Sequence, residues 1–176
     1  MAETIENLTY GDDDDNQIIG DNSPGVTHVI HGEGGDDYLV GASGDDVLHG
    51  GTGNDVLVGG DGDDQLHGGA GDDLLYGDGL AQEQHPGDSD SDTFFYRSGG
   101  GNDWIKDFDD GVDRIDLSGV SSVHDMSDLT ITKERFGAKI SFGDEAGSIN
   151  LLYFNADDLD ASDFIFQGAT DGVDGL

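Results

Sequence analysis

An aspartate recurs every nine residues through the middle of the chain. Five consecutive blocks of nine begin at residues 32, 41, 50, 59 and 68, and the sixth position of each is Asp: Asp37, Asp46, Asp55, Asp64 and Asp73. Regularly spaced carboxylates are ligands for hard cations such as calcium, which take about six to eight oxygen atoms. The sequence has no Cys, which excludes thiolate sites and disfavours zinc or copper. The spacing therefore predicts a row of oxygen-only cation sites.

The rest of each block predicts the element that positions these carboxylates. The eighth position is always Leu (Leu39, Leu48, Leu57, Leu66 and Leu75), and the fourth is always Gly. In a short strand the eighth side chain faces the core while the seventh and ninth face outward, and Gly permits the positive φ of a tight turn. Four degenerate copies flank the array. Before it, one copy has Asn16 and Ile18 in the sixth and eighth positions, and residues 20–31 form a second copy with a longer turn. After it, one copy has Asp92 and Phe94 in these positions, and the next has Asp103 and Ile105.

These blocks resemble the glycine-rich nonapeptide of RTX (hemolysin-type) calcium-binding proteins. The resemblance covers about residues 11–107 and implies an all-β fold, a parallel β-roll in which six residues turn, three form a strand and two blocks complete one coil. A small antiparallel β region is expected to cap it. The resulting domains are residues 1–107, the calcium-binding roll, and residues 108–176, the cap with a type I secretion signal.

In the resembled family each calcium ion lies between the turns of blocks i and i+2. Carried over, this pairs Asp37 with Asp55 and Asp55 with Asp73 on one edge, and Asp46 with Asp64 on the other. The implied ligands are the sixth-position side chains and the turn carbonyls. The complete set is Asn16, Asp37, Asp46, Asp55, Asp64, Asp73, Asp92, Asp103, Gly32, Gly34, Gly35, Gly41, Ser43, Gly44, Gly50, Gly51, Thr52, Gly53, Gly59, Gly60, Asp61, Gly62, Gly68, Gly69, Ala70, Gly71, Gly77 and Gly79.

Energetics also favour a metal. Fixing nine backbone residues costs about 9 to 18 kcal/mol, whereas one buried Leu returns about 1.5 to 3 kcal/mol. Stacked coils also bring Asp carboxylates about 4.7 to 4.9 Å apart, where they repel without a cation. Folding and calcium binding are thus expected to be one equilibrium. The alternative is that Asp and Gly form only solvated Asx turns. The fifth-position acids (Asp36, Asp45, Asp63 and Asp72) and the run from Asp12 to Asp15 are interpreted as solvated charge.

The charge and the apolar content of the chain limit the classes of partner that it can bind. The chain has 176 residues, with 40 Asp and Glu against 6 Lys and Arg, a net charge of -34 that argues against nucleic acid. No segment is apolar enough to predict a membrane span or an N-terminal signal peptide.

The second half loses the nine-residue period. Residues 104–108 and 114–120 are expected to form a hairpin of two strands joined by an Asp and Gly loop, followed by strands in 128–132, 138–142 and 148–154. This cap is expected to bury Trp104, Phe108, Phe142 and Phe154. Residues 99–120 and 155–166 resemble the region after the roll in serralysin-type metalloproteases and mannuronan C5-epimerase R-modules. That resemblance implies type I secretion to the extracellular space, with Asp163, Phe164, Ile165 and Phe166 in the export region, although residues 167–176 follow the apolar end.

Two surface features are not explained by the repeat. His31, His49 and His67 occupy every second ninth position and are expected to stack within about 5 Å of each other, with His85 continuing the spacing. They are interpreted as a polar ladder, with a transition-metal site or a pH-dependent anion patch as alternatives. The opposite sheet presents an apolar patch that the cap, residues 77–93 or an attached domain should cover: Tyr38, Val40, Val56, Val58, Leu74 and Tyr76.

Catalysis is not predicted. H-E-x-x-H and G-x-S-x-G are both missing from the sequence. Three hypotheses follow: a non-catalytic module of a type I secreted protein that calcium folds outside the cell, a polysaccharide (alginate)-binding accessory module beside a catalytic domain, and an enzyme with unrecognised carboxylate chemistry.

Overall fold

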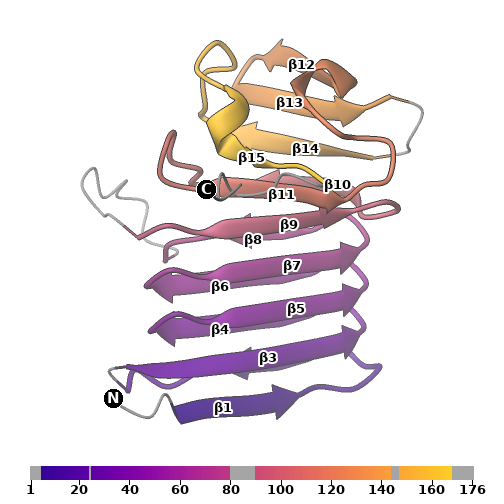
Figure 1. Ribbon diagram of the computed structural model, residues 1–176. Coiled ribbons are helices and arrows are strands. Elements are labelled where there is room, and N and C mark those ends of the chain that lie inside the picture. Colours follow the sequence, from indigo (N-terminus) through magenta and orange to yellow (C-terminus); the bar gives the residue numbers. More distant parts are fainter. Residues whose placement is uncertain (1–4, 24, 80–89, 144–146, 168–176) are drawn as a thin grey trace, which may run out of the picture.

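The computed structural model describes residues 5–23, 25–79, 90–143 and 147–167. Within these ranges the chain forms two sheets, called sheet A and sheet B, of seven and eight strands. From β1 to β11 successive strands alternate between the sheets, so each pair of strands makes one coil and the coils stack from the N-terminal end toward the cap (Figure 1). This confirms the predicted parallel β-roll.

The strand bounds follow the spatial order of each sheet. Sheet A contains β1 (Ile5–Tyr10), β3 (Val26–Gly34), β5 (Val47–Thr52), β7 (Gln65–Ala70), β9 (Thr93–Arg97), β11 (Arg114–Gly119) and β15 (Phe164–Ile165). Sheet B contains β12 (Leu129–Glu134), β13 (Gly137–Phe142), β14 (Gly147–Leu152), β10 (Gly101–Ile105), β8 (Leu74–Tyr76), β6 (Val56–Asp61), β4 (Tyr38–Ser43) and β2 (Gln17–Ile19). Short 3-10 helices η1 (Met126–Asp128) and η2 (Ala161–Asp163) lie in the cap region.

Every second block occupies the same place on successive coils. Leu48 therefore aligns with Leu66 on sheet A, and Leu39 aligns with Leu57 on sheet B. All five repeat Leu side chains are at most 2% exposed and form the core between the sheets. The flanking copies join the same columns, because Ile30 and Phe94 are each 1% exposed.

The strands of the central coils are longer than the three residues expected. In β4 to β7 the pairing continues into the first turn positions, where Ala42 aligns with Gly60 and Thr52 with Ala70. The turns stack in register, so their backbones stay parallel beyond the three-residue strand and the β-sheet hydrogen bonds continue into the turn.

The expected pairing of residues 104–108 with 114–120 is wrong. β10 and β11 belong to different sheets, where β10 pairs in parallel with β8 and β14, and β11 with β9 and β15. The core residues Ile105 and Ile115 explain this, because each continues the column of apolar side chains in its own sheet. The division into residues 1–107 and 108–176 stays a prediction, although parallel pairing continues through β11 and β15.

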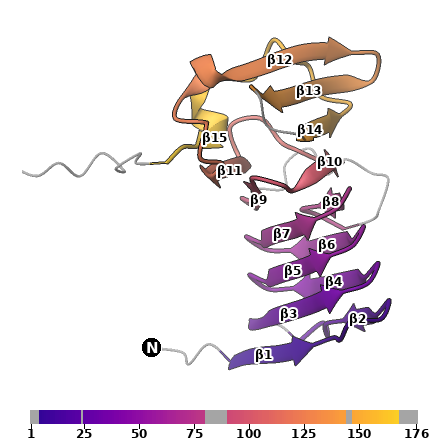
Figure 2. The same ribbon diagram turned by 90° about the vertical axis from the view of Figure 1, so that its right-hand side faces the viewer.

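The cap is an antiparallel meander of β12, β13 and β14 joined to sheet B through β14 (Figure 2). It buries Phe108 and Phe142, and Phe154 packs against the same core while partly exposed. Trp104 departs from the expectation, since its side chain lies on the outer face of sheet B and is 42% exposed. No helix in the described ranges is long and apolar enough to cross a bilayer.

Candidate metal centre

The sixth-position residues form two columns of hydrogen bonds, one at each edge of the roll. In the first ladder the backbone N–H of each residue donates to the Oδ1 of the acid one coil further on: Asp37 to Asp55 (2.8 Å), Asp55 to Asp73 (2.9 Å) and Asp73 to Asp103 (3.1 Å). Asn16 begins this ladder by donating its N–H to Asp37 at 2.8 Å. The predicted pairs on this edge therefore lie on adjacent coils.

The second ladder runs along the opposite edge. His28 donates its N–H to the Oδ1 of Asp46 at 2.6 Å, and the same contact joins Asp46 to Asp64, Asp64 to Asp92 and Asp92 to Asp113. Each of the four aspartates is at most 4% exposed. The ladders thus hold one carboxylate oxygen of every rung in a fixed, buried position.

The second oxygen of each repeat aspartate is unpaired. Among the described residues, Oδ2 is buried without a hydrogen-bond partner in Asp37, Asp46, Asp55, Asp64 and Asp73. A methyl group placed on Gly41 would overlap both the Oδ2 of Asp46 and the carbonyl oxygen of Gly59. Carboxylate and backbone oxygens therefore face one small space, which is what oxygen coordination of a cation requires.

Burial makes these carboxylates poor anions in the ion-free fold. Desolvation is the largest cause and neighbouring aspartates add to it, so that the pKa of Asp64 rises to about 9, that of Asp92 to about 8 and that of Asp73 to about 7. The pKa of Asp103 rises to about 8 for the same two reasons. A buried charge of this kind must be neutralised or paired with a cation.

The residues fit a hard cation whose shell is mostly backbone. Within the described ranges, no group of three or more His, Cys, Asp or Glu side chains is arranged to hold a metal ion. Since each turn offers one sixth-position carboxylate, the turn carbonyls would supply the remaining oxygen atoms. Calcium accepts this mixture of carboxylate and carbonyl ligands, whereas transition metals favour nitrogen and sulfur.

The predicted turn positions lie where coils approach most closely. A methyl group at Gly53 would overlap the Gly35 carbonyl oxygen, and one at Gly62 would overlap that of Gly44. Gly79 differs, because nothing lies within 4 Å of the corresponding point. The ligand roles of the turn carbonyls stay predictions.

The fifth-position acids are exposed and form an outer row of hydrogen bonds. Asp36 accepts the N–H of Asn54 at 2.8 Å, and Asp72 accepts that of Asn102 at 2.8 Å. The side chains of all four, Asp36, Asp45, Asp63 and Asp72, are solvent-accessible, as are those of Asp12 to Asp15.

Sequence reasoning missed three members of the site region. Asp113 ends the second ladder, and the signal was present in its Asp-x-Ile spacing to the buried Ile115. Asp107 accepts the N–H groups of Gly77 and Asp78 at 3.0 and 3.2 Å, and burial raises its pKa to about 7. His28 occupies the sixth position of the copy at residues 20–31, but the longer turn of that copy obscured its alignment with the repeat.

The three histidines form the stack that the spacing predicts. The ring centroids of His31 and His49 are 4.5 Å apart, and those of His49 and His67 are 4.4 Å apart. Tyr10 and Phe95 extend the column at its two ends. Burial lowers the pKa of His67 to about 3. The alternatives of a transition-metal site and an anion patch stay predictions, and His85 lies outside the described residues.

The apolar patch on sheet B is partly covered. Val58 is 3% exposed although strand alternation directs it away from the core, whereas Trp104 on the same face is 42% exposed. Residues 80–89 of the predicted covering segment lie outside the described ranges. Its identity as the cover therefore stays a prediction.

Comparisons with known proteins identify the repeat and the fold. Residues 29–48 and 49–79 match the RTX calcium-binding nonapeptide repeat. The extracellular lipase LipA from Serratia marcescens shares the fold, with a TM-score of 0.50, 15% identity and 93% of this chain covered. This chain spans 40% of the lipase chain.

Two subunits of the mannuronan C5-epimerase from Azotobacter vinelandii were also found. AlgE6R3 has a TM-score of 0.47 and 25% identity over 92% of this chain and 84% of that one. AlgE6R2 has a TM-score of 0.45 and 23% identity over 96% and 95%. A search of curated proteins gave no significant match.

Proposed function

We propose that this array of RTX calcium-binding repeats is a non-catalytic module that calcium folds outside the cell. The observation that carries the proposal is the set of five buried Oδ2 atoms without partners. A buried polar atom without a partner costs about 1 to 3 kcal/mol, and more when it is charged. Calcium bound there supplies the countercharge and the missing contacts, while the Gly-rich turns supply carbonyl oxygens.

By mass action, bound calcium shifts the equilibrium toward the folded chain. A site filled at 100 times its dissociation constant adds about 2.7 kcal/mol to the stability of the folded chain, and several sites in two ladders add together. The low calcium of the cytosol would leave the chain unfolded for export. The higher calcium outside the cell would then fold it.

The C-terminal segment fits an export signal that is read before folding. Asp163 is fully buried and its Oδ2 accepts the N–H of Asp160 at 2.7 Å, while Phe164 is 5% exposed in β15 against β11. Folding therefore buries Asp163 and Phe164 and leaves Ile165 and Phe166 partly exposed. A type I exporter would meet the whole segment only in the unfolded chain.

The folding proposal is tested by circular dichroism and size measurement with calcium, with magnesium and with excess chelator. At pH 8 we expect a compact β-rich protein only with calcium. An ordered roll that survives exhaustive chelation at this pH contradicts the proposal. For export, co-expression with a type I exporter should show that removal of residues 155–176 stops secretion.

A second candidate function is binding of an anionic polysaccharide. It is favoured by one column on the outer face of sheet B, in which Trp104 aligns with Asn150 and Asn150 with Lys139. Lys106 lies 5.3 Å from the centre of the Trp104 ring. Aromatic surface beside cations suits sugar rings that carry carboxylates. Calorimetry with alginate oligomers tests it, with Trp104→Ala expected to abolish any heat of binding.

A further inference from the structure

Each acid ladder begins, at the N-terminal end of the roll, with a residue that is not an acid. Asn16 occupies the sixth position of the first ladder, and His28 occupies that of the second. Both donate a backbone N–H to the first aspartate of their ladder in the same way as the later rungs. Their side chains, however, behave differently from those of the repeat aspartates.

The side chain of Asn16 is satisfied within its own turn. Its Oδ1 accepts the N–H of Asp12 at 2.8 Å, and its Nδ2 donates to the Oδ1 of Asp12 at 3.0 Å. A methyl group at Gly11 would overlap this Oδ1 and approach the Gly32 carbonyl oxygen. The amide oxygen thus occupies the place that an unpaired Oδ2 takes in the repeat blocks, but here a backbone N–H satisfies it.

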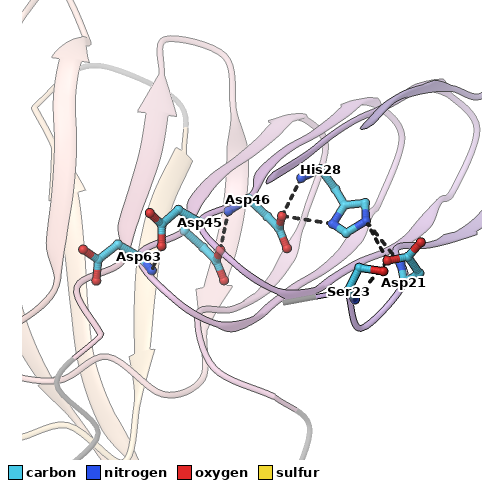
Figure 3. Close-up of polar contacts among 7 residues, drawn as sticks. Asp21, Ser23, His28, Asp45, Asp46 and Asp63 are labelled. Atoms are coloured by element: carbon cyan, nitrogen blue, oxygen red, sulfur yellow. Dashed lines mark hydrogen bonds and ion pairs between the residues drawn. The ribbon is translucent and has the colours of Figure 1, made fainter. Parts of the chain in front are cut away.

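His28 achieves the same result on the other edge (Figure 3). Its Nε2 lies 3.3 Å from the backbone N of Asp21, which donates to it, and its Nδ1 lies 3.2 Å from the Oδ1 of Asp46. The neutral tautomer with Nδ1–H satisfies both contacts. The ring is 4% exposed, so its contact with Asp46 is buried, whereas its contact with Asp21 is partly buried.

Asn16 and His28 differ from the repeat aspartates because their side-chain polar atoms have hydrogen-bond partners. Neither Asn16 nor His28 is among the described side chains with an unpaired buried oxygen or nitrogen atom, whereas Asp37 and Asp46, one coil further on, each have one. An imidazole nitrogen that already accepts an N–H is also a poor ligand for calcium, which selects oxygen atoms.

We propose that Asn16 and His28 are terminators that close the first coil without a calcium ion. The inference rests on the calcium-binding function proposed above. The ion sites then begin at Asp37 on the first edge and at Asp46 on the second. The N-terminal coil then needs no metal, because the Asn16 amide and the His28 imidazole make contacts that replace those of an ion in the later coils.

The test is to restore the repeat residue and count ions. In His28→Asp the second ladder gains a carboxylate in the sixth position, so calcium-binding stoichiometry, measured by equilibrium dialysis at saturation, should rise by one ion relative to the wild type. Asn16→Asp should do the same on the first edge. His124→Asp is the matched control, because it makes the same substitution at an exposed cap residue and should leave the stoichiometry unchanged.

A second measurement covers the case in which the variants do not fold. Crystals of the wild type soaked with terbium should show anomalous peaks along both ladders but none between the turns that carry His28 and Asp46. A peak there, or an unchanged ion count in folded His28→Asp and Asn16→Asp, overturns the inference. The calcium-binding proposal itself fails only if the wild type binds no ions, so the two failures are distinguishable.

Discussion

The backbone N–H of Asp64 donates a 2.9 Å hydrogen bond to the Oδ1 of Asp92, although 28 residues separate the two. Other rungs, such as Asp46 and Asp64, are 18 residues apart. The ten additional residues of the connection are therefore accommodated without a break in the ladder. The position of each rung is set by the strand that follows it, because Phe94 continues the core column of Leu66.

Replacement of Asp64 by Asn should separate the two roles of this carboxylate. The amide oxygen can still accept the N–H of Asp46, but it carries no charge. We expect the affinity for calcium at the adjoining sites to fall by about tenfold or more. The ion-free fold should become more stable, because a buried carboxylate whose pKa is raised to about 9 has been removed.

Calcium titration measures the first effect of Asp64→Asn, and circular dichroism in calcium-free buffer measures the second as residual β structure. Asp63→Asn is the control, since Asp63 is exposed and its Oδ1 accepts the N–H of Ser91 at 2.7 Å. If the two variants behave alike, the buried ladder is not the calcium site.

Close stacking of the turns predicts unequal costs for Gly→Ala substitutions. Gly53 has a φ of +128°, and a methyl group there would overlap the Gly35 carbonyl oxygen. The left-handed backbone alone costs about 1 to 2 kcal/mol, and the overlap adds about 1 to 3 kcal/mol. Gly99, with a φ of +87° and nothing within 4 Å, isolates the first cost. In thermal unfolding with calcium, the melting temperature of Gly53→Ala should be well below that of Gly99→Ala. Equal melting temperatures would contradict the close approach of Gly53 to the Gly35 carbonyl oxygen.

In calcium-free buffer, mild acid should stabilise the fold. Burial raises the pKa of Asp92 to about 8 and that of Asp64 to about 9, so the folded chain binds more protons than the unfolded chain. This contribution is complete below about pH 4 and is lost as the pH rises through about 8 to 9. His67 acts in the opposite direction, because its pKa of about 3 removes stability as the pH falls below about 6.5.

Circular dichroism of the metal-free protein should therefore show more β structure near pH 5.5 than at pH 8. Saturating calcium should remove most of this difference. A steady gain of structure from pH 5.5 to pH 8 without calcium would show that the aspartates are not buried as described.

Removal of one core Leu should weaken the whole roll. Leu57 is fully buried, so Leu57→Ala should cost about 2 to 5 kcal/mol in denaturant unfolding with calcium present. Leu8, which is 57% exposed on β1, is the matched control and should cost far less. Comparable losses would mean that the Leu columns are not the core.

The nine-residue period predicts the core Leu columns, and the family resemblance that it carries predicts the roll and places Asp37 next to Asp55 on adjacent coils. Those features repeat because each block makes the same contacts with its copy one coil away. Asp113 was missed although its Asp-x-Ile spacing continues the repeat, and Trp104 was expected to be buried although it is the seventh, outward-facing residue of the copy that carries Asp103 and Ile105. The hairpin expected between residues 104–108 and 114–120 is wrong because a short loop favours antiparallel pairing, but both strands have parallel partners in their own sheets.

The alignment of each block with its second neighbour makes the fold modular in units of two blocks. Excision of residues 50–67 removes one whole coil and leaves Leu39 facing Leu75 and Asp37 facing Asp73, so both ladders close over the gap. Excision of only residues 50–58 would exchange the sheets for every later block and place His67 beside Val40 instead of beside His49. In evolution such a protein could lengthen or shorten by eighteen residues at a time, with the number of ions changing in step.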